Sequence, residues 1–174
     1  PFAGRHVLEA LRGLGVDVVG AGTRARAGDE DFTTIIDSGD LVDHVGDADW
    51  VINAAPLTDA TRGLFDRTVF AAMKQSARFV SIGRGESTVT DDLLDALRTG
   101  AIAGAGLDVV DPEPLPVGHP LWDAPNTLIT AHLSGDTEGW NERLAAQFLD
   151  HWDLWVAGRP FPQTVDLQAG FVRS

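Results

Sequence analysis

Short apolar segments alternate with segments of helical periodicity along most of the chain. Apolar runs bounded by glycine or charged residues predict strands at residues 16–20, 49–54, 78–82, 105–109 and 127–130. Apolar residues at helical spacing predict helices at residues 4–14, 40–45, 66–73, 90–98 and 138–156. Strands that alternate with helices are typical of an α/β protein with a doubly wound parallel sheet, covered by helices on both faces.

The residues that follow the expected strands are the first candidates for function. In a parallel sheet of this kind, ligands bind beyond the carboxyl ends of the strands, where the strand order reverses. Those positions hold Thr23 with Arg24, Pro56, Gly83 with Arg84, Val110 and His132. The last helix carries an apolar stripe that we expect to close the fold: Leu144, Phe148, Trp152 and Trp155.

The beginning of the sequence departs from this pattern. A dinucleotide-binding domain opens with a strand and a glycine-rich turn, whereas this chain begins at Pro1 and enters a helix almost at once. We therefore expect the first strand and its turn to be missing. Gly4 precedes the first helix, where backbone N–H groups could bind a pyrophosphate. A glycine that merely starts a helix explains the same residue equally well.

The composition argues against several kinds of partner. A formal net charge of -13 disfavours nucleic acid, because an acidic surface repels phosphate. The absence of cysteine rules out disulfides, thiolate metal sites and a cysteine nucleophile, and we expect no bound metal. No apolar run is long enough to span a bilayer, and the N-terminus lacks the layout of a signal peptide. We therefore expect a cytoplasmic protein without a membrane partner.

The segment after the first expected strand, GAGTRARAG, contains one hydroxyl and two cations. A carboxylate at this place usually binds the ribose hydroxyls of NAD, and none occurs before Asp29. Thr23, Arg24 and Arg26 suit the additional 2′-phosphate of NADP instead, so we favour NADP over NAD. The alternative interpretation is a solvated basic loop.

Three longer segments resemble a known family. They are AAPLTDATRGLF at residues 54–65, FVSIGRGESTVTDDLLDALRTGAIAGAGLDVVDPEPLP at residues 79–116, and NTLITAHLSGDT at residues 126–137. In order and spacing they resemble the D-isomer-specific 2-hydroxyacid dehydrogenases, in particular glyoxylate and hydroxypyruvate reductases. Two positions depart from the pattern of that family. Pro1 stands where the second glycine of a G-x-G-x-x-G turn is expected, and Ala131 replaces the usual proline before His132.

The resemblance implies a Rossmann-like fold and an NAD(P)-dependent enzyme with the catalytic trio Arg84, Glu113 and His132. Arg84 would anchor the carboxylate of a small 2-keto or 2-hydroxy acid through its planar fork. His132 would exchange the hydroxyl proton, since imidazole titrates near neutral pH, and Glu113 would orient it. Taken singly, Arg84 could pair with a surface acid, Glu113 could be solvated, and His132 could be a core histidine.

The resemblance also implies a set of cofactor-binding residues. They are Phe2, Ala3, Gly4, Thr23, Arg24, Arg26, Ala55, Pro56, Thr61, Ile82, Gly83, Asp108, Ser134 and Gly135. Among them, Asp108 would contact the nicotinamide end, while Ala55, Pro56 and Thr61 would line the adenosine side.

The organisation of the chain follows from the same resemblance. Residues 1–160 would form an N-terminally incomplete NAD(P)-binding domain, and residues 161–174 a tail returning toward a substrate domain that is mostly absent. We expect a homodimer, because members of the family usually pair through this domain. The alternative function is a dinucleotide-sensing corepressor-type binding protein of the same fold, and an enzyme that oxidises formate or phosphite is a third option. The sequence does not identify the hydroxy acid, although glyoxylate and hydroxypyruvate are first candidates by analogy.

Overall fold

The computed structural model describes residues 10–11, 13–27, 32, 34–167 and 171–172. The chain forms two compact units, of which the first ends at Ala131 and the second begins at His132. The predicted domain boundary at residue 160 stays a prediction.

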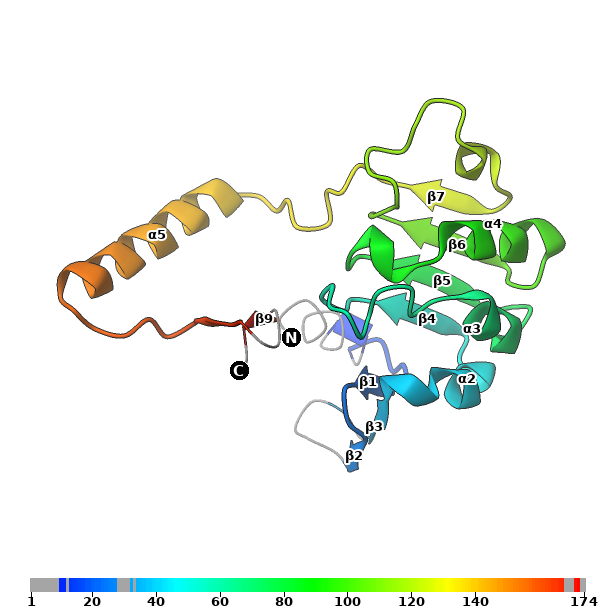
Figure 1. Ribbon diagram of the computed structural model, residues 1–174, viewed down its shortest axis with the longest axis horizontal. Coiled ribbons are helices and arrows are strands. Elements are labelled where there is room, and N and C mark those ends of the chain that lie inside the picture. Colours follow the sequence, from blue (N-terminus) through cyan, green and yellow to red (C-terminus); the bar gives the residue numbers. More distant parts are fainter. Residues whose placement is uncertain (1–9, 12, 28–31, 33, 168–170, 173–174) are drawn as a thin grey trace. The chain divides into compact units, whose positions relative to one another are not determined.

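A four-stranded parallel sheet organises the first unit (Figure 1). Its strands, in spatial order, are β4 (Trp50–Asn53), β5 (Arg78–Ser81), β6 (Gly104–Leu107) and β7 (Thr127–Ile129). The last residues of all four strands are partners in the register, so the strands end in one row. This confirms the predicted α/β class with a parallel sheet, and it creates the edge at which ligands are expected.

Three helices pack on one face of this sheet: α2 (Leu41–His44), α3 (Arg67–Ala72) and α4 (Thr90–Thr99). Helix α3 begins where the Asp66 carboxylate accepts hydrogen bonds from the backbone N–H groups of Thr68 and Val69. Helix α4 ends at Gly100, whose φ of 69° lies in the left-handed region that favours glycine. Four short 3-10 helices complete the connections: η1 (Ser38–Asp40), η2 (Val45–Asp47), η3 (Gly85–Ser87) and η4 (Pro120–Asp123).

The hydrophobic core lies between these helices and the sheet. Phe79 of β5 is fully buried, with its ring centroid 5.0 Å from that of Phe65 and 5.3 Å from that of Phe70. Leu93 and Leu97 of α4 are buried in the same cluster. Each fully buried side chain of this size contributes about 2 kcal/mol from apolar burial, so the core fixes the positions of the strand ends.

The other face of the sheet is less covered by the described residues. Its register row consists of Ile52, Val80, Gly106 and Leu128. The first three are half-buried and Leu128 is 67% exposed. The helix expected at residues 4–14 lies largely outside the described residues.

A smaller three-stranded sheet precedes the large one. It contains β1 (Gly20–Gly22), β3 (Thr34–Asp37) and β2 (Arg26–Ala27), with β1 parallel and β2 antiparallel to β3. The strand predicted at residues 16–20 was placed too early, since it starts at Gly20 and leaves Val19 61% exposed. Gly20 packs against the Phe32 ring, and a Cβ at Gly20 would lie 2.8 Å from the nearest ring atom. This close packing accompanies the start of β1 at Gly20. Strand β3 was missed because only two isoleucines form its apolar run.

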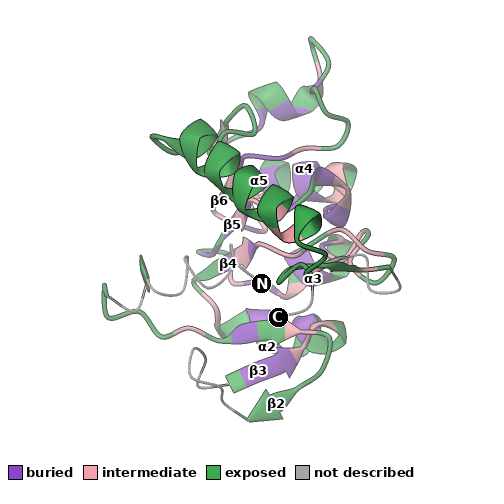
Figure 2. Ribbon diagram, turned by 90° about the vertical axis from the view of Figure 1, so that its left-hand side faces the viewer, coloured by how far each residue is buried: buried purple, intermediate pink, exposed green. Residues whose placement is uncertain are grey.

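The second unit contains helix α5 (Trp140–Val156) and the hairpin β8 (Val165–Asp166) and β9 (Phe171–Val172). Helix α5 forms close to its predicted bounds but buries none of its residues (Figure 2). The predicted apolar stripe is exposed, for example by 62% at Phe148 and 50% at Trp152. A hairpin of two residue pairs has too little apolar surface to cover a helix of 17 residues.

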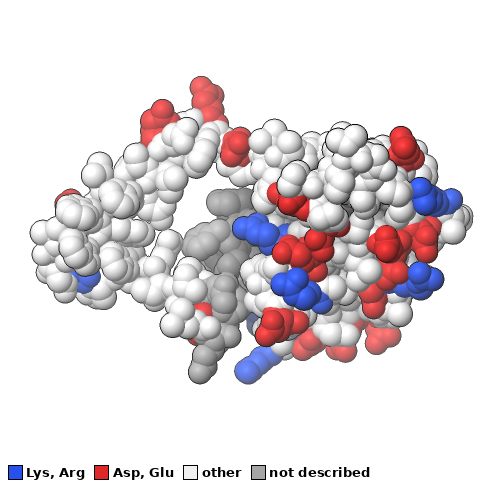
Figure 3. Space-filling view, turned by 45° about the horizontal axis from the view of Figure 1, so that its top comes forward, with Lys and Arg blue, Asp and Glu red and all other residues white. Residues whose placement is uncertain are grey.

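Among the helices of the described residues, none combines the length and apolar character that a membrane crossing requires. Acidic and basic side chains are interspersed over the first unit on the face shown in Figure 3. One such group joins α3 to α4, where Arg67 lies 3.1 Å from Asp92 and 3.2 Å from Asp95. Exposed pairs of this kind add little stability, so the apolar core remains the main source of order.

Candidate active site at the carboxyl ends of the parallel strands

The row of strand ends brings several predicted residues to one edge. Ala55 and Pro56 follow β4, Gly83 and Arg84 follow β5, and Asp108 follows β6. These segments are joined by backbone hydrogen bonds, including Ile82 N to Asn53 O at 2.9 Å and Asp108 N to Ser81 O at 2.9 Å. These hydrogen bonds continue the sheet by one residue beyond β5 and β6. The structure therefore assembles this part of the predicted site on a rigid support.

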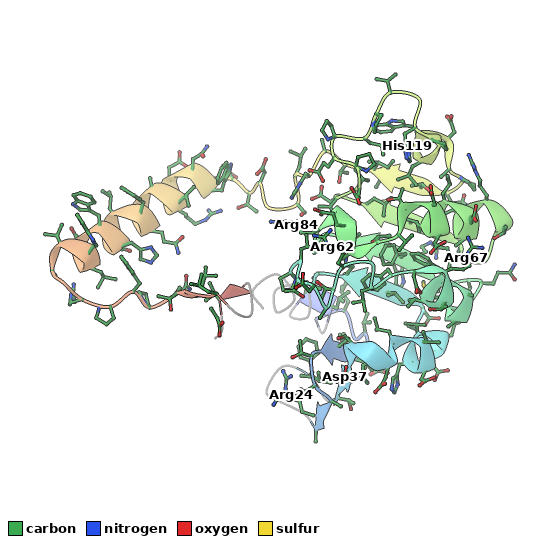
Figure 4. All side chains as sticks on the ribbon, in the orientation of Figure 1. Arg24, Asp37, Arg62, Arg67, Arg84 and His119 are labelled. Atoms are coloured by element: carbon green, nitrogen blue, oxygen red, sulfur yellow. The ribbon has the colours of Figure 1, made fainter. Side chains whose placement is uncertain are left out.

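Arg84 is exposed at the start of η3 (Figure 4). Its guanidinium donates one hydrogen bond, 2.8 Å long, to the carbonyl oxygen of Gly83. It makes no ion pair with any described residue. The interpretation of Arg84 as the partner of a surface acid therefore finds no support in the described part of the chain.

Two glycines allow the segment around Arg84, here called the arginine loop (residues 82–88), to approach its neighbours closely. A Cβ at Gly83 would lie 2.6 Å from the carbonyl oxygen of Ala55. A Cβ at Gly85 would overlap the carbonyl group of Val110, which follows β6. Side chains at these positions would push the arginine loop away from the segments after β4 and β6.

Asp108 is a buried carboxylate at the same edge, with 7% of its surface exposed. The Thr130 hydroxyl donates a 2.6 Å hydrogen bond to its Oδ1. Because a buried carboxylate needs such partners, Thr130 helps to keep Asp108 in place. Sequence reasoning identified Asp108 but missed Thr130, which stands directly after β7.

The turn after Pro56 is closed by the side chain of Thr61. Its hydroxyl donates to the carbonyl oxygen of Pro56 at 2.6 Å and accepts from the backbone N–H of Thr58 at 2.8 Å. Its single proton is thus used within the turn. Gly63 N then donates to Glu86 O at 2.9 Å, so the end of this turn pairs with the arginine loop. Figure 4 shows Arg62 and Arg84 projecting from these two segments.

Thr23, Arg24 and Arg26 lie on the stretch from the end of β1 through β2 (residues 22–27, here called the β1–β2 segment), and all three are exposed. Arg24 makes no hydrogen bond or ion pair with any described residue (Figure 4). A hydroxyl and two guanidinium groups beyond the carboxyl end of a parallel strand form a donor set that suits a phosphate. The residues present are therefore compatible with the 2′-phosphate of NADP.

The remaining predicted residues are distributed over both units. Glu113 is exposed in the long connection between β6 and β7. His132 opens the second unit with a φ of 57°, followed by the exposed Ser134 and Gly135. The predicted trio thus spans the two units. Phe2, Ala3 and Gly4 lie outside the described residues.

The strongest missed feature is a buried polar cluster of Asn53, Ser81 and Ser87. Asn53 is a polar residue at the end of an otherwise apolar strand, which is the signal that could have identified it. In the described residues, no group of three or more His, Cys, Asp or Glu side chains is arranged to hold a metal ion.

One known family matches most of the chain. Residues 3–134 match the family described as D-isomer specific 2-hydroxyacid dehydrogenase, NAD binding domain. The chain belongs to this family. The family resemblance inferred from the motifs is confirmed, and the fold is that of its Rossmann-like domain.

Similar proteins of this family include a human enzyme and two bacterial proteins of known structure. The chain is 38% identical over 120 residues to human glyoxylate reductase/hydroxypyruvate reductase, covering 69% of this chain and 37% of that protein. The NADPH-dependent glyoxylate/hydroxypyruvate reductase of Sinorhizobium meliloti, solved with NADP and sulfate, has a TM-score of 0.85 and 29% identity, over 97% of this chain and 54% of that one.

The third is a D-isomer specific 2-hydroxyacid dehydrogenase of Xanthobacter autotrophicus, solved with NADPH and MES. Its TM-score is 0.84 at 33% identity, over 94% of this chain and 66% of that chain. Two curated relatives match 97% of this chain. The chain spans only 55% and 59% of the length of these relatives.

Proposed function

We propose that this chain provides the cofactor-binding and catalytic groups of an NADPH-dependent reductase of small 2-keto acids, which also works in reverse as a D-2-hydroxyacid dehydrogenase. The observation that carries this proposal is the exposed Arg84 guanidinium. It lies on a tightly packed loop at the strand-end edge, next to the segment that bears Asp108, without a carboxylate partner among the described residues. A permanently charged planar group in that position is suited to an anionic ligand.

Arg84 would bind the substrate carboxylate and the neighbouring keto oxygen. Two parallel N–H donors fix the orientation of a 2-keto acid, and the positive charge stabilises negative charge that develops on the keto oxygen during reduction. The fixed arginine loop matters because a misplacement of about 1 Å at a reacting centre can cost about 100-fold in rate.

The cofactor would lie along the same edge. Thr23, Arg24 and Arg26 would hold the 2′-phosphate, and further contacts would come from Ala55, Pro56, Thr61, Ile82, Gly83 and Asp108 of the first unit. Ser134 and Gly135 of the second unit stay contacts predicted from the sequence. When bound, the nicotinamide supplies the hydride. The Sinorhizobium structure contains NADP and the Xanthobacter structure contains NADPH, which supports the preference for NADP.

His132 would donate the proton that the reduced keto oxygen needs, and would accept it in the reverse reaction. Glu113 would orient the imidazole by accepting a hydrogen bond from its other nitrogen. The φ of 57° at His132 supports a functional role, since non-glycine residues with such backbone angles concentrate at functional positions.

The substrate class rests on the named relatives. Human and Sinorhizobium relatives are glyoxylate/hydroxypyruvate reductases, so glyoxylate and hydroxypyruvate are the first substrates to try. The cytoplasmic location and the homodimer stay predictions from the sequence.

The proposal is tested by NADPH consumption with a panel of 2-keto acids. We expect turnover with at least one of them, and faster turnover with NADPH than with NADH. Tight dinucleotide binding without turnover of any panel member would contradict the proposal and would favour the corepressor-type function.

A His132→Ala variant tests the proton-transfer role. Removal of a general acid costs about 100-fold or more, so we expect kcat to fall by that factor while the dissociation constant for NADPH stays unchanged. Parallel losses of turnover and of NADPH binding would instead assign His132 a structural role.

A further inference from the structure

Asn53, Ser81 and Ser87 form a polar cluster inside the first unit. Their exposed fractions are 1%, 1% and 0%, and they come from the end of β4, the end of β5 and the end of η3. Buried polar groups are unfavourable unless each finds hydrogen-bond partners. The partners of these three side chains therefore indicate what the cluster does.

The Asn53 amide links the turn that begins with Ala55 and Pro56, here called the proline turn, to the two serines. Its Nδ2 donates to Ser81 Oγ at 3.0 Å and to Ser87 Oγ at 2.6 Å, while its Oδ1 accepts from Ala55 N at 3.2 Å. Because Ala55 N can only donate, the amide oxygen must face Ala55 and the amide nitrogen must face the serines. The two amide protons are then both used.

Ser87 connects the Asn53 amide to the main chain of Arg84. Since its hydroxyl accepts from Asn53, its one proton is available for the Arg84 carbonyl oxygen, 2.6 Å away. The backbone N–H of Ser87 donates to the same carbonyl at 3.2 Å. The main chain of Arg84 is thus held by two hydrogen bonds, one of which depends on the side chain of Ser87.

We propose that Asn53 and Ser87 are positioning residues that fix the main chain of Arg84 relative to the proline turn. Through this network, the segment that carries Ala55 and Pro56 and the loop that carries Arg84 keep a constant spacing. The inference rests on the proposed function, because it assigns to the cluster the task of presenting Arg84 to the substrate.

Ser81 provides a matched control. Ser81 and Ser87 are both buried, and both accept a hydrogen bond from the Asn53 amide. Replacing either by alanine removes one hydroxyl and leaves one amide proton of Asn53 without its acceptor. Only the Ser87→Ala change also removes the hydrogen bond to the Arg84 carbonyl.

The experiment compares Ser87→Ala with Ser81→Ala and the wild type. With saturating NADPH and glyoxylate as the varied substrate, we expect KM to rise about tenfold in Ser87→Ala, as for the loss of one good hydrogen bond, and by less than about twofold in Ser81→Ala. The NADPH dissociation constant should stay the same in both. Equal KM changes in the two variants would overturn the inference, because a purely structural cluster would respond to either loss.

Hydrogen exchange separates the failure of this inference from a failure of the proposed function. Amides of residues 82–88 should exchange faster in Ser87→Ala than in Ser81→Ala, whether or not the chain turns over a 2-keto acid. Equal exchange in the two variants would overturn the positioning role. Faster exchange in Ser87→Ala together with no turnover by the wild type would keep that role and reject the proposed substrate.

Discussion

The arginine loop and the β1–β2 segment both lie at the end of a parallel strand and both present arginines, yet they are held in different ways. The arginine loop packs against the segments after β4 and β6 and is anchored by buried hydroxyls. The β1–β2 segment pairs only with β3 among the described residues, and its side chains from Thr23 to Ala27 are exposed.

This difference matches the two kinds of anion binding that we propose for these segments. A group that orients a reacting carbonyl must be held within about 0.5 Å, so a rigid loop is required. A phosphate far from the reacting atoms needs charge and donors, which mobile side chains can also supply. We therefore expect substitutions that disturb packing to have severe effects in the arginine loop and mild effects in the β1–β2 segment.

The largest expected effect is a difference between two glycine substitutions. In Gly85→Ala the new Cβ would overlap the Val110 carbonyl, so we expect the free energy of unfolding to fall by about 3 kcal/mol. In Gly22→Ala the nearest atoms lie 3.5 and 3.7 Å from the new Cβ, an ordinary contact, and the change should stay below about 1 kcal/mol. Urea unfolding of both variants measures the difference. Equal losses would show that the two regions are equally tightly packed.

In the β1–β2 segment we expect substitutions to change the affinity for the cofactor instead. Loss of one charged contact to phosphate in Arg24→Ala should weaken NADPH binding about tenfold and leave NADH binding unchanged. Arg98→Ala, which removes a cation from α4, is the control and should change neither value. If the wild-type chain binds NADPH and NADH equally well, the assignment of the β1–β2 segment to the 2′-phosphate is wrong.

The smallest expected effect concerns two aspartates outside these two regions, of which Asp66 caps α3 and Asp37 caps η1. Asp66 accepts hydrogen bonds from Thr68 N, Val69 N and the Thr68 hydroxyl, whereas Asp37 accepts one from Gly39 N. Asp66→Ala should cost about 1 kcal/mol, as helix caps do, and Asp37→Ala should cost less. A larger loss in Asp37→Ala, measured by thermal unfolding, would reverse the expected order.

The Asp66 cap should also depend on pH. The hydrogen bond from the Thr68 hydroxyl is the main cause that lowers the pKa of Asp66 below its ordinary value of 3.8, and the backbone donors add to it while partial burial opposes. A carboxyl whose pKa is lowered by folding stabilises the fold above its unfolded-state pKa, and this contribution is lost as the pH falls through 3.8 and below. Asp66→Asn keeps an uncharged cap, so its stability should change less over that range than that of the wild type.

Much of the fold could be predicted because local pattern and burial agree. The strands around Phe79 and Val51 are apolar runs that the structure buries, and their order follows from strand–helix alternation. Strand β3 gave too short a signal, and β1 was misplaced because Val16 and Val19 look like a buried strand although both are exposed. The apolar stripe predicted helix α5 correctly, but the expected burial of the stripe is not observed. Periodicity alone does not say what covers an apolar helix face.

The candidate site was predictable where single residue types carry distinctive chemistry. Arg84, Asp108 and Arg24 stand after strands in motifs, and the structure shows them at the carboxyl ends of their strands. Asn53 and Ser87 were missed because asparagine and serine are common in turns. The Asn53 amide donates to Ser81 and Ser87, which lie 28 and 34 residues further along the chain, and no local pattern reveals such pairs.

The most direct test of the central claim is the reduction of glyoxylate or hydroxypyruvate by NADPH, measured for the wild type and for Arg84→Lys. A lysine keeps the charge but loses the planar fork, so we predict a fall in kcat/KM of about 100-fold or more with an unchanged dissociation constant for NADPH. Near-normal kcat/KM in Arg84→Lys, from a wild-type chain that turns over these acids, would contradict the assignment of Arg84 as the substrate anchor.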